Sequence, residues 1–423
     1  MKLSKYNIVH TVNGKTYLYN SLTKAAIRLN SEETAAIDFA NDSIVDIQAL
    51  LNHASIEQLV KNGFIVDDDF DELKAIEYIY RKNFFDSSDL TLILTPTFEC
   101  NFACPYCFEA PQRGAKTSTV YFDALKRYAS RYFRFYRHVE LSLFGGEPLL
   151  LYKQFNDMLS FTRMLSKQHS FSYSTSITTN GSLLNRDVVH TLLSHNCKTF
   201  QITIDGGKAS HDKTRSFKDK KPSFDLLMKV INEELHELYD DESAEFYLRF
   251  NLNNNTPNEI RSALLEIKED IRQHIIVVLR AVYSTSLYSS NNSNSVDELK
   301  EYYDVASELG FRISNNRYFN RSCEACCDEK VFYVTPDLGV WKCINTMSLP
   351  HGKVGYITED GDFKVDAKNL IKWYIAADCF ADDKCRNCKM LPDCFGGCIL
   401  HTAIHGTHKC TPFDMTSLSY FYN

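Results

Sequence analysis

Fourteen cysteines, gathered into two groups, constrain this chain more than any other feature of its sequence. Three lie between Cys100 and Cys107, ten lie between Cys323 and Cys410, and Cys197 stands apart. The first residues lack the apolar stretch of a secretory signal, so we expect a cytoplasmic protein whose thiols stay reduced. Clustered thiols in such a compartment indicate metal binding rather than disulfides. Cys197 is predicted to be an ordinary buried thiol.

Length and charge narrow the possibilities further. At 423 residues the chain is too long for one compact core, so two or three domains are expected. The formal net charge of -7 argues against a nucleic-acid partner, whose binding normally leaves a basic surface. There is no run of about 18 apolar residues, so neither a transmembrane helix nor a membrane partner is expected.

Residues 1–85 are predicted to form a separate module. Its expected elements are a hairpin with strands Tyr6–His10 and Thr16–Tyr19 around Asn13-Gly14, helical stretches with N-caps at Ser31 and Ser55, and a closing strand at Gly63–Val66. This combination suggests a winged-helix-like module. Such a module could serve as a recognition domain for a peptide.

Residues 86–283 alternate between strand and helix patterns, which indicates an α/β fold with a parallel sheet. The strand candidates are Leu90–Leu94, Val139–Phe144, Phe171–Thr179, Thr199–Ile204, Glu245–Leu252 and Ile275–Val282. The clearest helical patterns are Tyr121–Tyr136, Phe155–Lys167 and Phe224–Leu238. Six such units would make a partial (β/α)6 barrel. We expect a linker and bridging helix at 284–310, with Ser284–Ser295 as the loop, and a cysteine-rich domain at 311–423 that metal must hold together.

The first cysteine group directly follows a predicted strand. Cys100, Cys104 and Cys107 have the spacing Cys-x3-Cys-x2-Cys, which gives three thiolates on one loop. Three ligands on a four-iron cluster leave one iron open for a substrate or cofactor. Zinc normally takes four ligands, but spacing alone leaves zinc as an alternative.

These residues resemble the radical S-adenosylmethionine (SAM) superfamily, whose cluster loop ends the first barrel strand and has an aromatic residue, here Tyr106, before the third cysteine. Phe144-Gly145-Gly146-Glu147-Pro148 is similar to the SAM-binding GGEP motif of that superfamily. Two further stretches are similar to its SAM-contacting regions: Thr178-Thr179-Asn180-Gly181, and Ile202–Gly206 followed by His211–Arg215. The resemblance implies that Cys100, Cys104 and Cys107 form the catalytic cluster site. It also implies SAM contacts at Tyr106, Gly145, Gly146, Glu147, Thr179, Asn180 and Arg215, with Arg215 on the SAM carboxylate.

Four other polar residues of the barrel are given structural roles. Asp205 is expected to form a turn and His211 to make structural hydrogen bonds. The same interpretation is preferred for Arg249 and Asn251, on a later strand.

The second cysteine group resembles the SPASM domain. The spacing Cys385-x2-Cys388-x5-Cys394-x3-Cys398, then Cys410, carries the resemblance, together with the cysteines before Pro336 and Cys343 after Trp341-Lys342. The resemblance implies one auxiliary cluster on Cys323, Cys327, Cys343 and Cys398 and another on Cys385, Cys388, Cys394 and Cys410. Cys379 and Cys326 would be spare, although the choice between Cys326 and its neighbours stays open. The cofactors would be three [4Fe-4S] clusters and SAM, with zinc as the alternative.

The resemblance implies a radical SAM/SPASM peptide maturase. Such an enzyme generates a 5′-deoxyadenosyl radical and abstracts a hydrogen atom from a ribosomally made precursor peptide to form an intramolecular thioether or carbon–carbon crosslink. Its expected partners are a precursor peptide with a leader, which would add as a strand to the N-terminal module, and a reductant such as flavodoxin or ferredoxin. A sulfatase-maturing, formylglycine-forming enzyme is an alternative, but such enzymes usually carry an acidic residue where this chain has Ile344. A noncatalytic zinc-binding interaction protein is the third interpretation.

Overall fold

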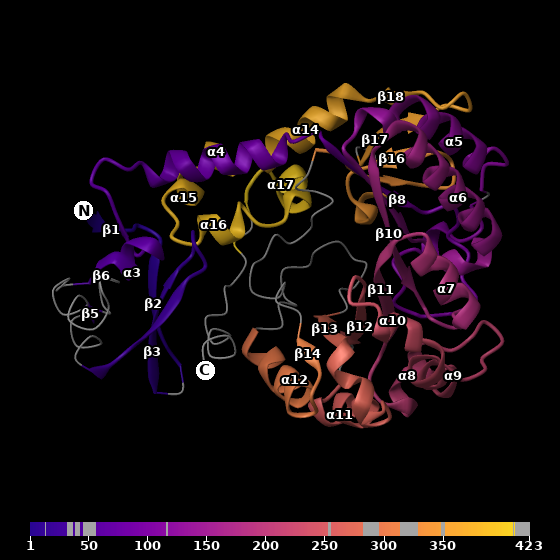
Figure 1. Ribbon diagram of the computed structural model, residues 1–423, viewed down its shortest axis with the longest axis horizontal. Helices are drawn as coiled ribbons and strands as arrows, with labels where there is room; N and C mark the ends of the chain where they lie inside the picture. Colours follow the sequence, from indigo (N-terminus) through magenta and orange to yellow (C-terminus); the bar gives the residue numbers. More distant parts are fainter. Residues whose placement is uncertain are drawn as a thin grey trace. The chain divides into compact units, whose positions relative to one another are not determined.

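The computed structural model describes residues 1–12, 14–31, 37–38, 43–44, 56–115, 117–252, 255–281, 296–313, 329–347, 352–408 and 410. The chain divides into two compact units (Figure 1). The first joins residues 1–85 to residues from Trp373 onward, and the second holds residues 86–314 and 328–372. The predicted four-part domain division stays a prediction.

The N-terminal part of the first unit contains the predicted hairpin. Strands β2 (Asn7–Val12) and β3 (Lys15–Asn20) pair antiparallel, and β4 (Ala26–Leu29) pairs with the other side of β3. Gly14 has a φ of 71°, the left-handed conformation that the tight turn requires, while Asn13 lies outside the described residues. The predicted closing strand is β7 (Ile65–Val66), which pairs with β1 (Lys2–Leu3).

The helical structure predicted after Ser31 is wrong for two short segments. Ile37–Asp38 (β5) and Ser43–Ile44 (β6) pair as short antiparallel strands. Asn41 and Asp42, between them in the sequence, favour a turn, and β-branched residues such as Ile37 favour strands. Ser55 lies outside the described residues, and helix α3 (Ile56–Lys61) follows it.

Helix α4 (Glu72–Phe84) packs against the C-terminal part of the same unit. That part consists of the end of α14 (Ala367–Ala377), η8 (Cys379–Ala381), α15 (Asp383–Arg386), α16 (Leu391–Cys394) and α17 (Ile399–His405). The Tyr80 ring lies 5.4 Å from that of Phe380 and 5.0 Å from that of Phe395, and its hydroxyl donates to the Ala377 carbonyl at 2.6 Å. Aromatic packing therefore joins two segments that lie about 300 positions apart in the sequence.

Asp393 makes a second connection inside the first unit. Its carboxylate is buried, with 1% exposure, pairs with Lys24, and accepts a hydrogen bond from the Tyr19 hydroxyl at 3.1 Å. The Ser21 hydroxyl bonds the Lys389 carbonyl nearby. The hairpin is thereby attached to the segment that carries Cys388 and Cys394.

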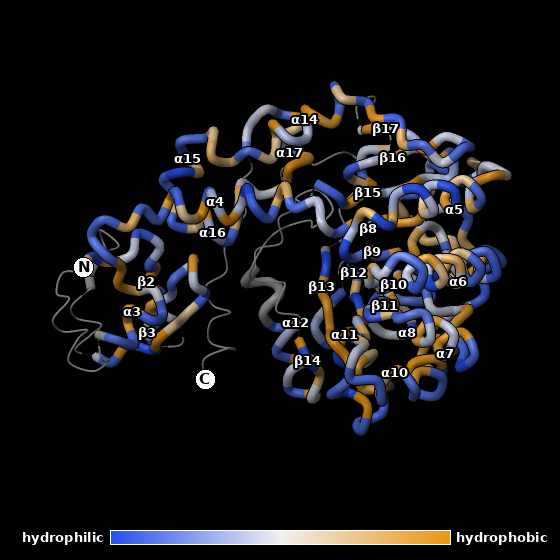
Figure 2. The backbone as a smooth tube through the Cα atoms, turned by 45° about the horizontal axis from the view of Figure 1, so that its top comes forward, coloured by the Kyte–Doolittle hydropathy of each residue, from blue (hydrophilic) through white to orange (hydrophobic). Residues whose placement is uncertain are grey.

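The second unit is built on a sheet in the order β14-β13-β12-β11-β10-β9-β8-β15-β16-β17-β18. Six of its strands are parallel neighbours and confirm the six predicted strands: β8 (Asp89–Leu94), β9 (His138–Leu143), β10 (Ser172–Thr179), β11 (Cys197–Ile204), β12 (Glu245–Leu252) and β13 (Ile275–Ala281). Figure 2 shows most of β13 as hydrophobic: residues 275–279 form an apolar, buried run, as expected for a parallel strand, and Arg280 follows it. The predicted loop Ser284–Ser295 lies outside the described residues.

Helices connect these strands and cover the sheet. They are α5 (Tyr121–Tyr132), α6 (Tyr152–His169), α7 (Arg186–Ser194), α8 (Lys208–Thr214), α9 (Phe224–Lys229), α10 (His236–Asp240), α11 (Pro257–Leu265) and α12 (Val296–Glu308). Helices α5, α6 and α7 lie along one side of the strands (Figure 1). The predicted helix Phe224–Leu238 is interrupted by the π-helical turn η4 (Val230–Glu234).

The sheet extends beyond the predicted barrel on both edges. Strand β14 (Arg312–Ile313) pairs with β13. Strand β15 (Val331–Val334) pairs parallel with β8, and β16 (Gly339–Trp341), β17 (Lys353–Ile357) and β18 (Phe363–Val365) continue antiparallel. Residues 331–365, predicted within the cysteine-rich domain, therefore complete the sheet of the barrel. Pairing between Val331 and Thr91, 240 positions apart, leaves no local sequence signal.

Among the described helices, none combines the length and the apolar composition that a bilayer crossing requires.

Replacing Lys24 by Met should lower the stability of the first unit markedly. The change leaves the Asp393 carboxylate buried without its cation, which typically costs about 3–5 kcal/mol. The apparent Tm of the protein, followed by differential scanning fluorimetry, should fall. Arg81→Met is the matched control, because the Arg81–Asp378 pair is partly exposed and such pairs contribute about 0–1 kcal/mol. Equal shifts for the two variants would contradict the role given to Asp393.

Candidate functional site

The loop that carries Cys100, Cys104 and Cys107 follows β8 and is held by the GGEP segment after β9. The Gly146 amide donates to the Thr97 carbonyl at 3.1 Å, and the Glu147 amide donates to the Glu99 carbonyl at 3.0 Å. A Cβ atom on Gly145 would lie 2.6 Å from the Thr97 oxygen, and one on Gly146 would lie 2.2 Å from the Glu99 oxygen. The two glycines are therefore required by the close approach of two backbones, whatever else they bind.

Glu147 connects this segment to the end of β10. Its side chain is fully buried and accepts hydrogen bonds from the Leu149 amide at 3.0 Å, the Thr179 hydroxyl at 2.8 Å and the Asn180 amide at 2.8 Å. Burial raises the pKa of the carboxyl, and these hydrogen bonds oppose that shift. Glu147 therefore fixes the position of Thr179 and Asn180.

Asn180 reaches the cysteine loop itself. Its side-chain amide donates to the Asn101 side-chain oxygen at 2.7 Å and lies 3.5 Å from the Cys100 sulfur. Cys100 also accepts from the Phe102 amide at 3.4 Å. Burial raises the pKa of the Cys100 thiol to about 11 in the absence of a metal. A cluster would take this position as a thiolate ligand, and the two N–H donors would stabilise that charge.

Tyr106 belongs to a buried polar group behind the loop. Its hydroxyl donates to Asp205 Oδ2 at 2.5 Å and accepts from Arg215 Nη1 at 2.9 Å, while the Thr214 hydroxyl donates to the same Asp205 oxygen at 2.8 Å. Arg215 is 7% exposed. In this group, the buried atoms Asp205 Oδ1 and Arg215 Nε have no hydrogen-bond partner among the described residues. The same holds for Glu109 Oε1 and Arg113 Nε, which follow Cys107 in the chain, so several buried donors and acceptors near the loop are unused.

The charge of Arg215 acts on the thiols. Burial raises the pKa of Cys104, and the Arg215 guanidinium is the largest influence that opposes this rise. In turn, Cys104, Tyr106 and Asp205 raise the pKa of Arg215 against its burial. Three neighbouring thiols beside a permanent cation suit an anionic iron–sulfur cluster, so the residues present fit the expected group.

The segment after Arg215 packs against the cysteine loop. The Ala103 amide donates to the Ser216 carbonyl at 2.9 Å, and the rings of Phe102 and Phe217 lie 4.8 Å apart. Lys218 pairs with Glu99 at 2.8 Å. No local pattern connects Phe217 and Lys218 with the cysteine loop, because their contacts with it are made only in the folded chain.

The structural roles expected for two residues are confirmed. His211 is fully buried, accepts from the Asp205 amide at 3.2 Å and lies 3.0 Å from the Ser223 hydroxyl. Burial lowers the pKa of His211 to about 3, so the ring is neutral at neutral pH. Cys197 is 2% exposed, as predicted for a buried thiol. Asp205, expected to be a turn residue, is instead the carboxylate of the Tyr106–Arg215 group; its position directly after β11 was the available signal.

The predicted ligands of the first auxiliary cluster belong to different parts of the chain. Cys343 follows β16 in the second unit, and Cys398 begins α17 in the first unit. Cys323, Cys326 and Cys327 lie outside the described residues. This ligand set stays a prediction.

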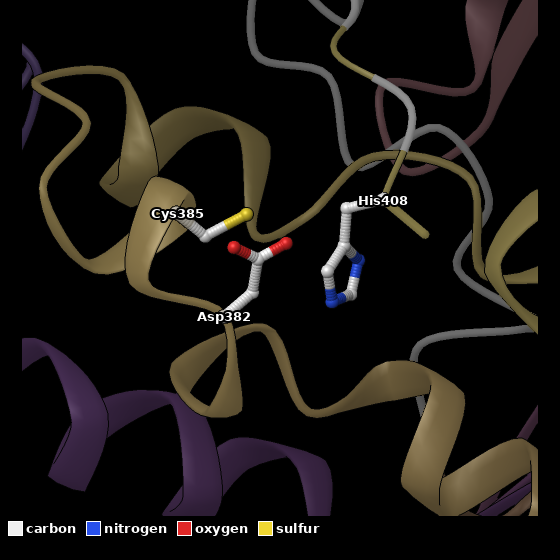
Figure 3. Close-up of side chains that lie close together, drawn as sticks. All are labelled: Asp382, Cys385 and His408. Atoms are coloured by element: carbon white, nitrogen blue, oxygen red, sulfur yellow. The ribbon is translucent and has the colours of Figure 1, made fainter. Parts of the chain in front are cut away.

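The predicted ligands of the second auxiliary cluster are neighbours within the first unit. Burial raises the pKa of Cys385 to about 12, and Asp382, Cys394, Cys410 and Cys388 add to the rise. Figure 3 shows Asp382, Cys385 and His408 turned toward one another, and their ligand atoms lie within 4.8 Å. Cys379, predicted to be spare, is fully buried and its pKa is raised by burial and then by Cys385. These thiols, with the nearby His408, match the donor types of a metal or iron–sulfur site.

Comparison with known proteins now gives the class of the chain. Residues 94–238 match the description "Radical SAM superfamily". The cysteine-type anaerobic sulfatase-maturating enzyme of Clostridium novyi (strain NT) is 26% identical over 335 residues, which cover 73% of this chain and 87% of that enzyme. The enzyme of the same name from Clostridium perfringens (strain 13 / Type A) is 25% identical over 340 residues, covering 73% and 88% of the two chains.

A solved structure, "Native anSMEcpe with bound AdoMet and Kp18Cys peptide", is similar in fold. It has a TM-score of 0.56 and 18% identity, and the match covers 79% of this chain and 95% of that one. Residues 94–238 are thus a radical SAM domain, and this chain is a radical SAM enzyme with a cysteine-rich C-terminal region. Such a domain binds SAM and an iron–sulfur cluster. The interpretation as a noncatalytic zinc-binding protein is therefore wrong.

Gly146→Ala should remove the cluster at the first cysteine group. The new Cβ would lie 2.2 Å from the Glu99 carbonyl oxygen, so the loop between β8 and Cys100 must shift. After anaerobic reconstitution, iron content should fall by about four per chain, and SAM cleavage should be lost. Gly310→Ala is the control: its Cβ meets no atom within 4 Å, and the strain from its φ of 86° arises after α12, away from the cysteine loop, so iron content and SAM cleavage should be kept. Unchanged iron in the Gly146 variant would show that the close contact is not required.

Proposed function

We propose that this radical SAM enzyme modifies a ribosomally made precursor peptide, by forming an intramolecular thioether or carbon–carbon crosslink. The first unit carries the proposal, because it adds a small sheet that can take an extended peptide. About a fifth of this chain lies outside the match to the sulfatase-maturating structure, which itself is matched over 95% of its length. The chain therefore has room for a recognition module beyond the catalytic domain.

The three-stranded sheet β2-β3-β4 has two edges that are unpaired within the described residues. Along an antiparallel pair, backbone N–H groups point alternately toward the partner strand and away from it. The Asn20 amide bonds the Ala25 carbonyl, so by this alternation the Arg28 amide of β4 points away from β3. By the same alternation, the bond from the Ser21 amide to the Tyr6 carbonyl directs the Val9 amide away from β3. Each edge thus offers backbone donors to an added strand, and a leader peptide is the proposed strand.

The roles proposed around the first cysteine group follow from the geometry. Cys100, Cys104 and Cys107 hold the cluster, and the cluster with SAM supplies the hydrogen-abstracting radical. Arg215, fixed by Tyr106 and Asp205, presents its free Nε–H to the SAM carboxylate. Gly145, Gly146 and Glu147 fix the loop, and Thr179 and Asn180 complete the SAM site at the end of β10. Pre-formed hydrogen bonds hold these groups before SAM arrives.

Two auxiliary clusters are part of the proposal, with a total of three. Cys385, Cys388, Cys394 and Cys410 would hold one, supported by their mutual electrostatic influence. Cys323, Cys327, Cys343 and Cys398 would hold the other. A flavodoxin or ferredoxin is the proposed electron donor.

A second candidate is a sulfatase-maturating activity, which the two Clostridium relatives favour. It would convert a cysteine of a sulfatase to formylglycine. Ile344, where those enzymes usually carry an acidic residue, is buried and apolar in this chain, so this position offers no proton acceptor. Mass spectrometry separates the two candidates. A crosslink removes only two hydrogens from the peptide, whereas formylglycine formation removes two hydrogens and also replaces the thiol sulfur by an aldehyde oxygen.

Replacing Cys100, Cys104 and Cys107 together by Ala should abolish SAM cleavage while auxiliary iron remains. The wild-type protein should bind about twelve irons and the variant about eight, because one of three four-iron clusters is lost. Iron analysis and 5′-deoxyadenosine formation are the measurements. Cys197→Ala is the matched control and should keep both values. Unchanged SAM cleavage in the triple variant would refute the cluster assignment.

Arg28→Pro and Val9→Pro test the leader site on the two sheet edges. Proline removes the outward amide at each position, so the variant on the edge that binds the leader should lose about tenfold or more in affinity. The measurement is fluorescence anisotropy with the labelled leader of a precursor peptide that the wild-type enzyme modifies. Arg28→Ala and Val9→Ala keep the amide and serve as controls. Unaltered affinity in both proline variants would exclude strand addition at this sheet.

A further inference from the structure

Two arginines lie on the face of the barrel sheet that the helices leave uncovered. Along β12, Phe246, Leu248 and Phe250 are buried, whereas Arg249 and Asn251 alternate with them and point to the opposite face. The register pairs Asn251 with Arg280 of β13, so both point to this same face. The positions lie at the carboxyl ends of the strands, where parallel sheets gather their ligands.

Arg249 is connected to the cysteine loop by hydrogen bonds. Its Nε donates to the Asn251 side-chain oxygen at 2.9 Å, and the Asn251 side-chain amide lies 3.4 Å from the Tyr106 hydroxyl. Tyr106 in turn contacts Arg215. Arg249 is therefore held within two hydrogen bonds of the residue that precedes Cys107.

The guanidinium of Arg249 has no carboxylate partner within 4.0 Å among the described residues. Asp205 is the nearest acidic group that acts on it, but Tyr106, Thr214 and Arg215 already engage that carboxylate. The terminal nitrogens of Arg249 make no hydrogen bond to a described residue. Among the described residues, the Arg280 side chain donates only to the Leu279 carbonyl, at 3.1 Å. The fixed orientation through Nε leaves the terminal edge of Arg249 available for a ligand.

The charges around this position do not balance. Arg215, Arg249 and Arg280 act together, with Asp205 as the carboxylate among them. Burial, followed by Arg280 and Arg215, lowers the pKa of Arg249 to about 10, so it remains charged at neutral pH but at a cost in free energy. An anion placed between Arg249 and Arg280 would remove that cost. Arg249 is half-buried and Arg280 is exposed, so a ligand can reach both. An uncompensated cation beside a reaction site is a feature typical of ligand binding.

We propose that Arg249, with Arg280, binds the carboxylate of an Asp or Glu side chain of the precursor peptide, next to the residue that is modified. This inference rests on the proposed function, because it requires a peptide in the barrel. The side-chain carboxylate is the anion that an unmodified ribosomal peptide supplies, and it matches the planar fork of a guanidinium. The carboxylate of SAM is assigned to Arg215, which leaves Arg249 and Arg280 for the substrate.

The test uses the full-length reconstituted enzyme and a precursor peptide, chosen from short open reading frames next to its gene, that the wild-type enzyme is first shown to modify. Each Asp and Glu of the peptide is changed singly to Asn or Gln, and the enzyme is changed at Arg249→Gln. At one acidic position, the amide peptide should lose about 10- to 100-fold in kcat/KM with wild-type enzyme, mainly through KM, as expected for a hydrogen bond between charged groups. Arg249→Gln should lose about as much with the unchanged peptide, and should lose nothing further with that amide peptide.

Three controls separate binding of the peptide from other effects. Arg261→Gln makes the same change on α11, where Arg261 pairs with Glu308 in solvent, and should behave as wild type. Arg249→Lys retains the charge and should recover part of the loss, and Arg280→Gln should give a smaller loss at the same peptide position. SAM cleavage without peptide, iron content and the dissociation constant of SAM should be unchanged in all variants.

Several results would overturn the inference. If Arg249→Gln weakens SAM binding or SAM cleavage without peptide, Arg249 belongs to the SAM site. If, for every amide peptide, the loss in kcat/KM with the Arg249→Gln enzyme equals the product of the two separate losses, Arg249 does not contact any of these carboxylates. If wild-type enzyme modifies none of the candidate peptides, the proposed function itself fails, whereas wild-type modification with an unaffected Arg249→Gln enzyme overturns this inference alone.

Discussion

The buried carboxylate of Glu147 is the interaction on which the rest of the site depends. It lies four residues after the end of β9, and its two oxygens accept hydrogen bonds from the Leu149 amide, the Thr179 hydroxyl and the Asn180 amide. Asn180 then reaches Cys100, so one side chain joins three neighbouring strand ends. Burying a carboxylate is costly unless hydrogen bonds compensate it, and here three donors are fixed in place for that purpose. Hydrogen bonds from neighbouring strand ends thereby hold the cysteine loop in position.

Parts of the barrel also differ in whether a charged side chain has a partner of opposite charge. Asp205 compensates Arg215 through Tyr106, which stabilises the loop from behind. Arg249, one strand further, has no such partner among the described residues. Positive charge therefore increases from the centre of the site toward β13. In the first unit, the buried charge of Asp393 is compensated, because the carboxylate pairs with Lys24 and accepts a hydrogen bond from Tyr19.

Much of the architecture was predictable because it rests on local patterns. Each of the six barrel strands was expected within three residues of its observed bounds, since apolar strands alternate with amphipathic helices. The hairpin around Gly14 was signalled by a specific turn pair. The strands β5 and β6 and the pairing of β15 with β8 were missed. Short strands carry little periodicity, and a pairing across 240 positions carries none.

The sequence by itself determined the class of chemistry, because thiol spacing and the Gly-Gly-Glu segment are local features that a loop must contain to hold a cluster. It could not give the purpose of each residue. Only the tertiary structure decided that Gly146 is needed for a backbone contact, that Asp205 is an electrostatic partner rather than a turn residue, and that Arg249 and Arg280 point to the same face of neighbouring strands. Contacts between separate strands set these roles, and such contacts are established by the register of the sheet, which no single stretch of sequence encodes.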